Sequence, residues 1–373
     1  MMKTLYSKMK ISNKNKLLIT VSILILFTIE GCKDSGTDVQ PVKDPRNYSW
    51  SVDTLAFPNS AQTLMRNLWG SSAKDVYAVG WNNQAFGQMW HYDGTSWTDV
   101  KLHVFQGGNI GGTIGLLAIS GISGSNIWAV GNKVHSNPTP PPNFLNNHLI
   151  INYDGTSWKE ISFKERGFLP GIYVQSSSNI WASGDSTIYH YDGVKWTREH
   201  VPLVIPANSS LYISKIISTG IAVYATGTLQ NNNTGDVVFY FFKRDEKGWR
   251  IVETSLTPFS FGLGGFWLSP SGKLYSVGRG LFVLNGSTWS NVFYSTTNFS
   301  GVYGTSDTNI FIAGTDGSVG IVYHYNGQDW KKLDQLTANN ILYTSVWTDG
   351  TEAFISGFTL SAFPQKTIIW HGK

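Results

Sequence analysis

The sequence has little cysteine and little charge. Cys32 is its one cysteine, and no spacing of Cys or His resembles a zinc motif. Charged residues make up 14% of the chain, against about 25% in an average globular protein. Together with the many Trp, Tyr and Gly residues, this composition favours stacked sheets buried on both faces over a helical enzyme.

Common catalytic and nucleotide-binding motifs are also absent. No G-x-S-x-G, P-loop or G-x-G-x-x-G stands between a predicted strand and a predicted helix. We therefore expect neither a cofactor nor a metal ion.

The net charge of +4 arises near the N-terminus. Residues 1–31 hold five of the 28 basic residues and one of the 24 acidic ones, so residues 32–373 carry 23 of each sign. A nucleic-acid-binding protein needs a basic surface. The balance argues against that class.

The chain does contain a repeated unit, clearest in residues 69–80 and 89–100. Residues 69–80 read WGSSAKDVYAVG, in which apolar and polar residues alternate up to Gly80, as in a strand that reaches a turn. Asp93-Gly94 then suits a tight hairpin turn. Each unit is thus expected to be an antiparallel meander of four strands.

Two series of anchor residues count the units. The glycines that end the second strand are Gly80, Gly131, Gly184, Gly227, Gly278, Gly314 and Gly357. The tryptophans of the fourth strand are Trp50, Trp97, Trp158, Trp196, Trp249, Trp289 and Trp330. Trp50 precedes the first glycine of the series, Gly80. The last glycine of the series, Gly357, is followed by a third strand but by no fourth strand. A period of roughly 40–50 residues is typical of propeller blades. The sequence predicts an all-β, seven-bladed β-propeller over residues 47–373, with the N-terminal strand completing the last blade and closing the ring.

These repeats resemble the W-G-x-S-x-x-D-V-Y-A-V-G … H-Y-D-G-x-x-W family of bacterial secreted propellers. The resemblance covers residues 47–373 and implies the fold, with little about function. WD40 and kelch signatures are absent in register, and adjacent Asp and Gly distinguish the Y-D-G-x-x-W turn from an Asp-box.

The N-terminus resembles a bacterial lipoprotein signal. Residues 1–16 are basic, and residues 17–29 form an apolar run shorter than the roughly 20 residues of a membrane span. The run leads into Ile29-Glu30-Gly31-Cys32. The resemblance implies a signal peptide over 1–31, a lipid (palmitate-type) anchor on Cys32, a flexible tether over 32–46 and attachment to the bacterial outer membrane, with exposure at the cell surface left open. The alternatives are an ordinary signal peptide or a cysteine in a core.

Repeated aromatic and histidine positions are interpreted as architecture. An aromatic in register in blade after blade is expected to pack between sheets. His91, His190 and His324 share one position of the third strand. Different blades would hold them far apart, so we expect structural polar contacts and no metal site.

Long connections point to a ligand-binding face. Connections between strands 2 and 3 and from strand 4 to the next blade are long and irregular, and binding evolves on such loops. They are residues 132–147, 228–236, 358–367, 102–112, 163–170 and 200–210. We predict that this face, including the mouth of the central channel, binds the ligand. Candidate contact residues are Phe86, Phe105, Phe144, Phe168 and Phe363; the alternative is that these rings fold back onto the blades.

Three functions fit these observations. The first is a non-catalytic, monomeric, lipid-anchored surface module that binds a glycan or a protein. The second is a carbohydrate-active enzyme, a glycoside hydrolase or lyase; a hydrolase needs two converging carboxylates. The acids of the variable loops, however, are scattered over different blades. They are Glu165, Glu199, Asp236, Glu253 and Asp334. The third function is a structural subunit of an envelope complex.

Overall fold

The computed structural model describes residues 43–163, 165–257, 261–360 and 363–373. The predicted signal peptide, Cys32 and most of the tether lie outside these residues. The described residues belong to one compact unit, 42–373, built almost entirely of strands. Its helices are three short 3-10 turns, η1 (Pro45–Asn47), η2 (Val104–Gln106) and η3 (Asp334–Leu336). Across these ranges, no helix has the length and hydrophobicity to cross a bilayer.

Four sheets each take four successive antiparallel strands, as the repeats predict. The first contains β2 (Thr63–Ser72), β3 (Asp75–Asn82), β4 (Met89–Tyr92) and β5 (Trp97–Asp99). The second contains β6 (Thr113–Ser123), β7 (Asn126–Ser136), β8 (Phe144–Tyr153) and β9 (Trp158–Ile161). The third contains β10 (Gly171–Ser176), β11 (Asn179–Ser183), β12 (Ile188–Tyr191) and β13 (Trp196–Glu199). The fourth contains β14 (Ser209–Ser218), β15 (Val223–Asn231), β16 (Val237–Asp245) and β17 (Gly248–Ser255).

The next two repeats are fused into one seven-stranded sheet. Its strands are β18 (Gly265–Leu268), β19 (Leu274–Asn285), β20 (Thr288–Ser306), β21 (Asn309–Asp316), β22 (Val319–Tyr325), β23 (Trp330–Lys332) and β24 (Ala338–Asn339). The early part of β20 pairs with β19, and its later part, from Asn298, pairs with β21. The predicted separation into four-stranded units fails here because the chain stays extended from Trp289 to Tyr303, with no loop between the two repeats.

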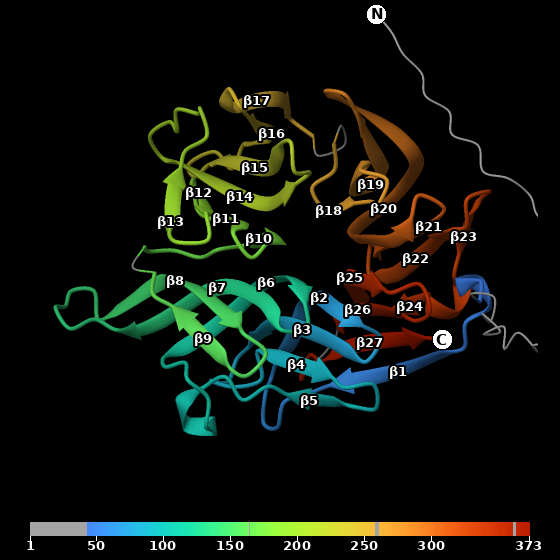
Figure 1. The fold of residues 1–373 in the computed structure, drawn as a ribbon, viewed down its shortest axis with the longest axis horizontal. Helices are drawn as coiled ribbons and strands as arrows, with labels where there is room; N and C mark the ends of the chain where they lie inside the picture. Colours follow the sequence, from blue (N-terminus) through green and yellow to red (C-terminus); the bar gives the residue numbers. More distant parts are fainter. Residues whose placement is uncertain (1–42, 164, 258–260, 361–362) are drawn as a thin grey trace, which may run out of the picture. The chain divides into compact units, whose positions relative to one another are not determined.

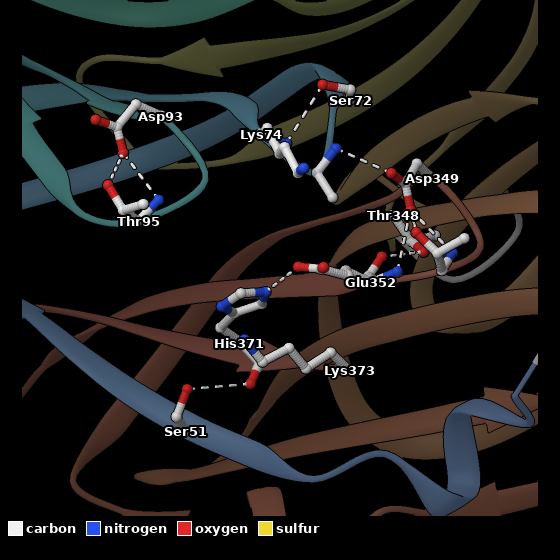
Figure 2. Close-up of polar contacts among 12 residues, drawn as sticks. Ser51, Ser72, Lys74, Asp93, Thr95, Thr348, Asp349, Glu352, His371 and Lys373 are labelled. Atoms are coloured by element: carbon white, nitrogen blue, oxygen red, sulfur yellow. Dashed lines mark hydrogen bonds and ion pairs between the residues drawn. The ribbon is translucent and has the colours of Figure 1, made fainter.

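The last sheet joins the two ends of the described chain. It contains β25 (Ile341–Thr348), β26 (Ala353–Thr359), β27 (Thr367–Gly372) and β1 (Trp50–Leu55). β1 pairs antiparallel with β27 over its whole length, and Ser51 Oγ lies 3.5 Å from the carbonyl oxygen of His371 (Figure 2). This sheet also bonds to the first one, because Asp349 accepts a hydrogen bond of 2.9 Å from the backbone N–H of Ala73 (Figure 2).

The first strands of the sheets lie nearest the centre of the unit (Figure 1). They contact one another in chain order, from β2 through β6, β10 and β14 to β18. β18 contacts β20, β20 contacts β25, and β25 contacts β2.

Neighbouring sheets meet where an aromatic ring covers a glycine. A Cβ atom on Gly121 would lie 2.7 Å from the Trp69 ring, and one on Gly70 would lie 2.9 Å from the Trp347 ring. The indole N–H of Trp69 also donates a hydrogen bond of 3.2 Å to the carbonyl of Gly121. These contacts confirm that the aromatics of the first strands pack between sheets.

The fourth-strand tryptophans pack in the same sense. Five of the seven rings contact an aromatic ring of the preceding sheet, and so connect one sheet to the next. Ring-centroid distances are 6.2 Å for Trp97–Phe354, 6.0 Å for Trp158–Tyr77, 6.1 Å for Trp196–Trp128, 6.3 Å for Trp249–Trp181 and 5.2 Å for Trp289–Phe241.

The third-strand histidines make structural contacts, as predicted. Nε2 lies 2.8 Å from Asp75 Oδ1 in His91, 2.9 Å from Asn179 Oδ1 in His190 and 2.9 Å from Asn309 Oδ1 in His324. Each acceptor lies at or near the start of a second strand, so the bond joins adjacent strands. Figure 2 shows the same arrangement between His371 and Glu352. In the described ranges, no three His, Cys, Asp or Glu side chains are grouped to hold a metal ion.

The variant His324→Asn should make the protein less sensitive to acid. Burial lowers the pKa of His324 to about 4, against about 6.5 in the unfolded chain. As the pH falls from about 6.5 to 4, only the unfolded state gains this proton, so stability is lost at up to about 1.4 kcal/mol per pH unit. Asparagine is a tolerable replacement because Asn152, at this position in the second sheet, donates to the carbonyl of Ile127.

The measurement is the free energy of unfolding by urea at several pH values. The pH slope of the variant should be shallower by up to one proton than that of the natural protein. His200→Asn, at an exposed position, is the control and should keep the slope. Equal slopes for the natural protein and His324→Asn would contradict the prediction.

Candidate functional site

The predicted ligand face is more regular than expected. Residues 132–136 and 144–147 continue β7 and β8 as a hairpin. Residues 228–231 likewise belong to β15, which ends at Asn231, and a turn over 232–236 leads to β16 at Val237. The prediction of irregular loops is wrong for these segments, because backbone pairing continues past the sheet and leaves only short turns at the tips.

The five candidate phenylalanines are spread over this face. The side chains of Phe105, Phe144 and Phe363 are 86%, 64% and 69% exposed. Phe168 instead stacks on Tyr212 at 6.1 Å.

Only two of the five rings share a neighbour. Phe86 and Phe105 both contact the ring of His103, at 5.4 and 5.0 Å. Phe86 also packs on Phe57. In the part of the chain described here, the five rings do not converge on one surface.

A cavity of about 320 Å³ lies among the first strands. Its walls come from β2, β6, β10, β14, β18, β20 and β25. Among the described residues, Lys215 is the one charged residue that lines it, and no Asp or Glu does. Hydroxyl, amide and aromatic groups line much of the remainder. They include Asn67, Ser120, Ser300, Thr344, Ser345, Trp69, Tyr173, Trp267 and Tyr303.

A β-bulge sets the position of Lys215. The register of β14 shifts between Ile213 and Lys215, and such a bulge re-aims the side chains around it. In β2 the bulge falls at Arg66, which has no partner residue in β3, and Asn67 follows it. Lys215 is therefore the counterpart of Asn67, one residue past the bulge.

Lys215 is influenced by a second cation, Arg66. Burial lowers the pKa of Lys215, and the positive charge of Arg66 lowers it further. Arg66 is exposed, and its guanidinium lies 5.7 Å from the centre of the Phe358 ring. Neither cation forms an ion pair with any described residue. Lys215 therefore lines the cavity without an ion-pair partner among the described residues, and Arg66 directly precedes Asn67, which lines the cavity too.

A second hollow, of about 530 Å³, lies at β12, β13 and residues 161–163 and 165. Aromatic rings of Phe163 and Trp196 contribute to it, together with Glu165 and Arg198. Here Arg198 lies 3.7 Å from Glu165 and donates to Thr187 at 3.2 Å, and the exposed Lys195 also contributes to the lining. The central cavity is the better candidate site, since seven strands of the described chain converge on it.

The acids considered for catalysis stay apart. None of the five lines the central cavity, and only Glu165 borders the second hollow. Glu199 is held by Arg244 at 2.7 Å and by the indole N–H of Trp249 at 2.6 Å.

Sequence reasoning missed Lys215 and Arg66. One signal was present: after the bulge, other first strands carry Ala118, Gly301 and Ser345, so Lys215 is a charged residue at an otherwise uncharged position. That Arg66 approaches it from another sheet has no signature in the sequence.

The variant Lys215→Met should stabilise the unliganded protein. Methionine fills similar space without a charge that burial and Arg66 disfavour, so the free energy of unfolding should rise by about 0.5–2 kcal/mol. Urea unfolding measures it. Lys247→Met, in the exposed turn before β17, is the control and should change stability by less than about 0.5 kcal/mol. A loss of stability in Lys215→Met would contradict this reading of the cavity.

Comparison with known proteins identifies the fold. No protein-family model and no curated protein matches the sequence. The solved structure of YCF48 from Cyanidioschyzon merolae is similar, with a TM-score of 0.52 at 10% identity, covering 86% of this chain and 98% of that one. The β-propeller domain of Cps50 (Swd1) from Myceliophteria thermophila gives 0.55 at 10% identity, covering 85% and 99%.

A GH74 enzyme from Niastella koreensis gives a TM-score of 0.54 at 13% identity, covering 84% of this chain and 55% of that one. At such identities the likeness concerns the fold alone. With its four-stranded antiparallel sheets, the described chain has an all-β architecture of the β-propeller type.

Proposed function

We propose that this chain is a non-catalytic binding module that recognises a glycan or protein partner through the face with the long connections, at the mouth of the central cavity. The observation that carries the proposal is Lys215, the one charged group among the described residues that line the cavity, which has no ion-pair partner there and lies among hydroxyl and aromatic groups. Arg66 directly precedes Asn67, another lining residue. Pockets with a few convergent polar groups among apolar ones are typical ligand sites.

The lining of the cavity supports binding over hydrolysis. Glycoside hydrolases use two carboxyl groups about 5–10 Å apart, and none of the described residues that line the cavity is acidic. The known structures with this fold include an enzyme, and at 13% identity that likeness concerns the fold alone.

The number of blades and the closure of the ring are also part of this proposal. We infer seven blades, with β20 shared by the two fused repeats, closed into a ring by β1. Supporting this inference, seven first-strand segments line the cavity and β25 contacts β2. A closed ring would hold the cavity walls rigid and so preorganise the site.

The proposal places the module at the bacterial outer membrane as a monomer, anchored by a lipid on Cys32 and tethered by residues 32–46. Metabolic labelling with a fatty-acid probe should mark the natural protein, and Cys32→Ala should lose the label. Equal labelling of both would contradict the anchor.

Binding is tested with the full-length protein in detergent, by its retention on gels cast with a panel of neutral and acidic polysaccharides. The gels are then assayed for new reducing ends and unsaturated products. Retention without cleavage is the expected result. Cleavage would contradict the non-catalytic proposal. If no polysaccharide retains the protein and crosslinking on intact cells yields no partner, the binding proposal fails as a whole.

A further inference from the structure

We propose that the central cavity binds an acidic sugar, with its anionic group held between Lys215 and Arg66. This inference rests on the proposed function and assigns a ligand class to the same site. The shared chemistry is an anionic group carried on a sugar ring, either the carboxylate of a uronic acid or a sulfate ester.

The positive charges of Lys215 and Arg66 favour an anionic ligand. Some cations of the described chain have acidic partners: Arg46 pairs with Asp329 at 2.8 Å, and Arg244 with Glu199 at 2.7 Å. At the cavity, by contrast, burial and Arg66 both disfavour the charged form of Lys215. A bound anion would remove this penalty.

The Arg66 side chain is well suited to bind an anion. Its planar guanidinium can form two parallel hydrogen bonds to a carboxylate or sulfate, whereas lysine acts as a compact point charge. The ring of Phe358 lies 5.7 Å below the guanidinium carbon and is itself only 8% exposed. This cation–π contact leaves the N–H groups at the rim of the guanidinium available to a ligand.

The rest of the lining suits a sugar ring better than a peptide. Ser120 and Ser345 accept backbone N–H groups from Val174 and Leu68, at 3.0 and 3.2 Å. Each hydroxyl proton remains free to donate, because neither donates to a residue in the described ranges.

Trp69 and Tyr173 also contribute to the lining, where the parts of their rings that face the cavity can contact the C–H groups of a sugar. The cavity volume of about 320 Å³ lies at the lower end of the range for small-ligand pockets, roughly 300–1,000 Å³. It therefore fits one or two sugar units and is too small for a folded partner to enter.

The test is isothermal titration calorimetry on the full-length protein in detergent. The probes are oligogalacturonate, the same oligosaccharide with its carboxyl groups reduced to alcohols, a sulfated galactan oligosaccharide and an acidic peptide. Lys215→Met and Arg66→Gln remove the cations one at a time. Lys215→Arg keeps the charge, and Lys247→Met, in an exposed turn, is the control for the same change in net charge.

The oligogalacturonate or the sulfated oligosaccharide should bind the natural protein, and which of them binds identifies the source of the anion. Because the ion contacts are partly buried, Kd should rise at least about tenfold in Lys215→Met and in Arg66→Gln. It should stay within about threefold in Lys247→Met, and Lys215→Arg should retain binding. The carboxyl-reduced oligosaccharide should bind at least about tenfold more weakly than its acidic parent if the uronate is the ligand.

Three results would overturn the inference. Binding of neutral oligosaccharides alone would refute the acidic ligand and leave the binding module intact. Binding of the acidic peptide without either acidic sugar would point to a protein partner. Acidic-sugar binding unchanged in both cavity variants would place that ligand elsewhere on the protein.

Discussion

The contact between an aromatic ring of one sheet and a glycine of the next is the interaction on which the other features depend. Trp69 lies on Gly121, Trp347 on Gly70 and Trp267 on Gly304, so several sheets are fixed against their neighbours by a contact that leaves no room for a side chain at the glycine. Repetition of this contact holds the first strands around a common cavity.

This packing separates architecture from function. The repeated tryptophans, glycines and histidines are committed to contacts between strands or sheets, and the acidic residues near the variable connections are either paired or dispersed. The position just after the β-bulge is less constrained, since Asn67, Ala118, Lys215, Gly301 and Ser345 line the cavity there. Burial disfavours the charged form of Lys215, and Arg66 is exposed apart from its contact with Phe358. The proposed ligand would account for a lysine at this position.

The sequence was sufficient for the local architecture. Alternation, turn residues and the two anchor series predicted the four-stranded sheets and the pairing of the first strand with the last. The structural roles of His91, His190 and His324 followed from their equal positions in the repeat. The sequence did not predict the fusion through β20, because the absence of a turn between Trp289 and Tyr303 is a weak signal. It also failed to predict the cation pair, because the approach of Lys215 to Arg66 depends on how separate sheets are arranged. The positions of the phenylalanines in the sequence did not indicate which rings share a neighbour; among the five candidates, as far as the structure describes them, Phe86 and Phe105 do so at His103.

A crystal structure of the protein with a bound acidic oligosaccharide tests the central claim most directly, since it locates the ligand and counts the blades together. The account predicts an anionic group between Lys215 Nζ and the guanidinium of Arg66, with the sugar ring against the cavity wall, inside a closed ring of seven blades. An oligosaccharide seated instead in the hollow at Phe163 and Trp196, with the central cavity holding only solvent, would contradict it.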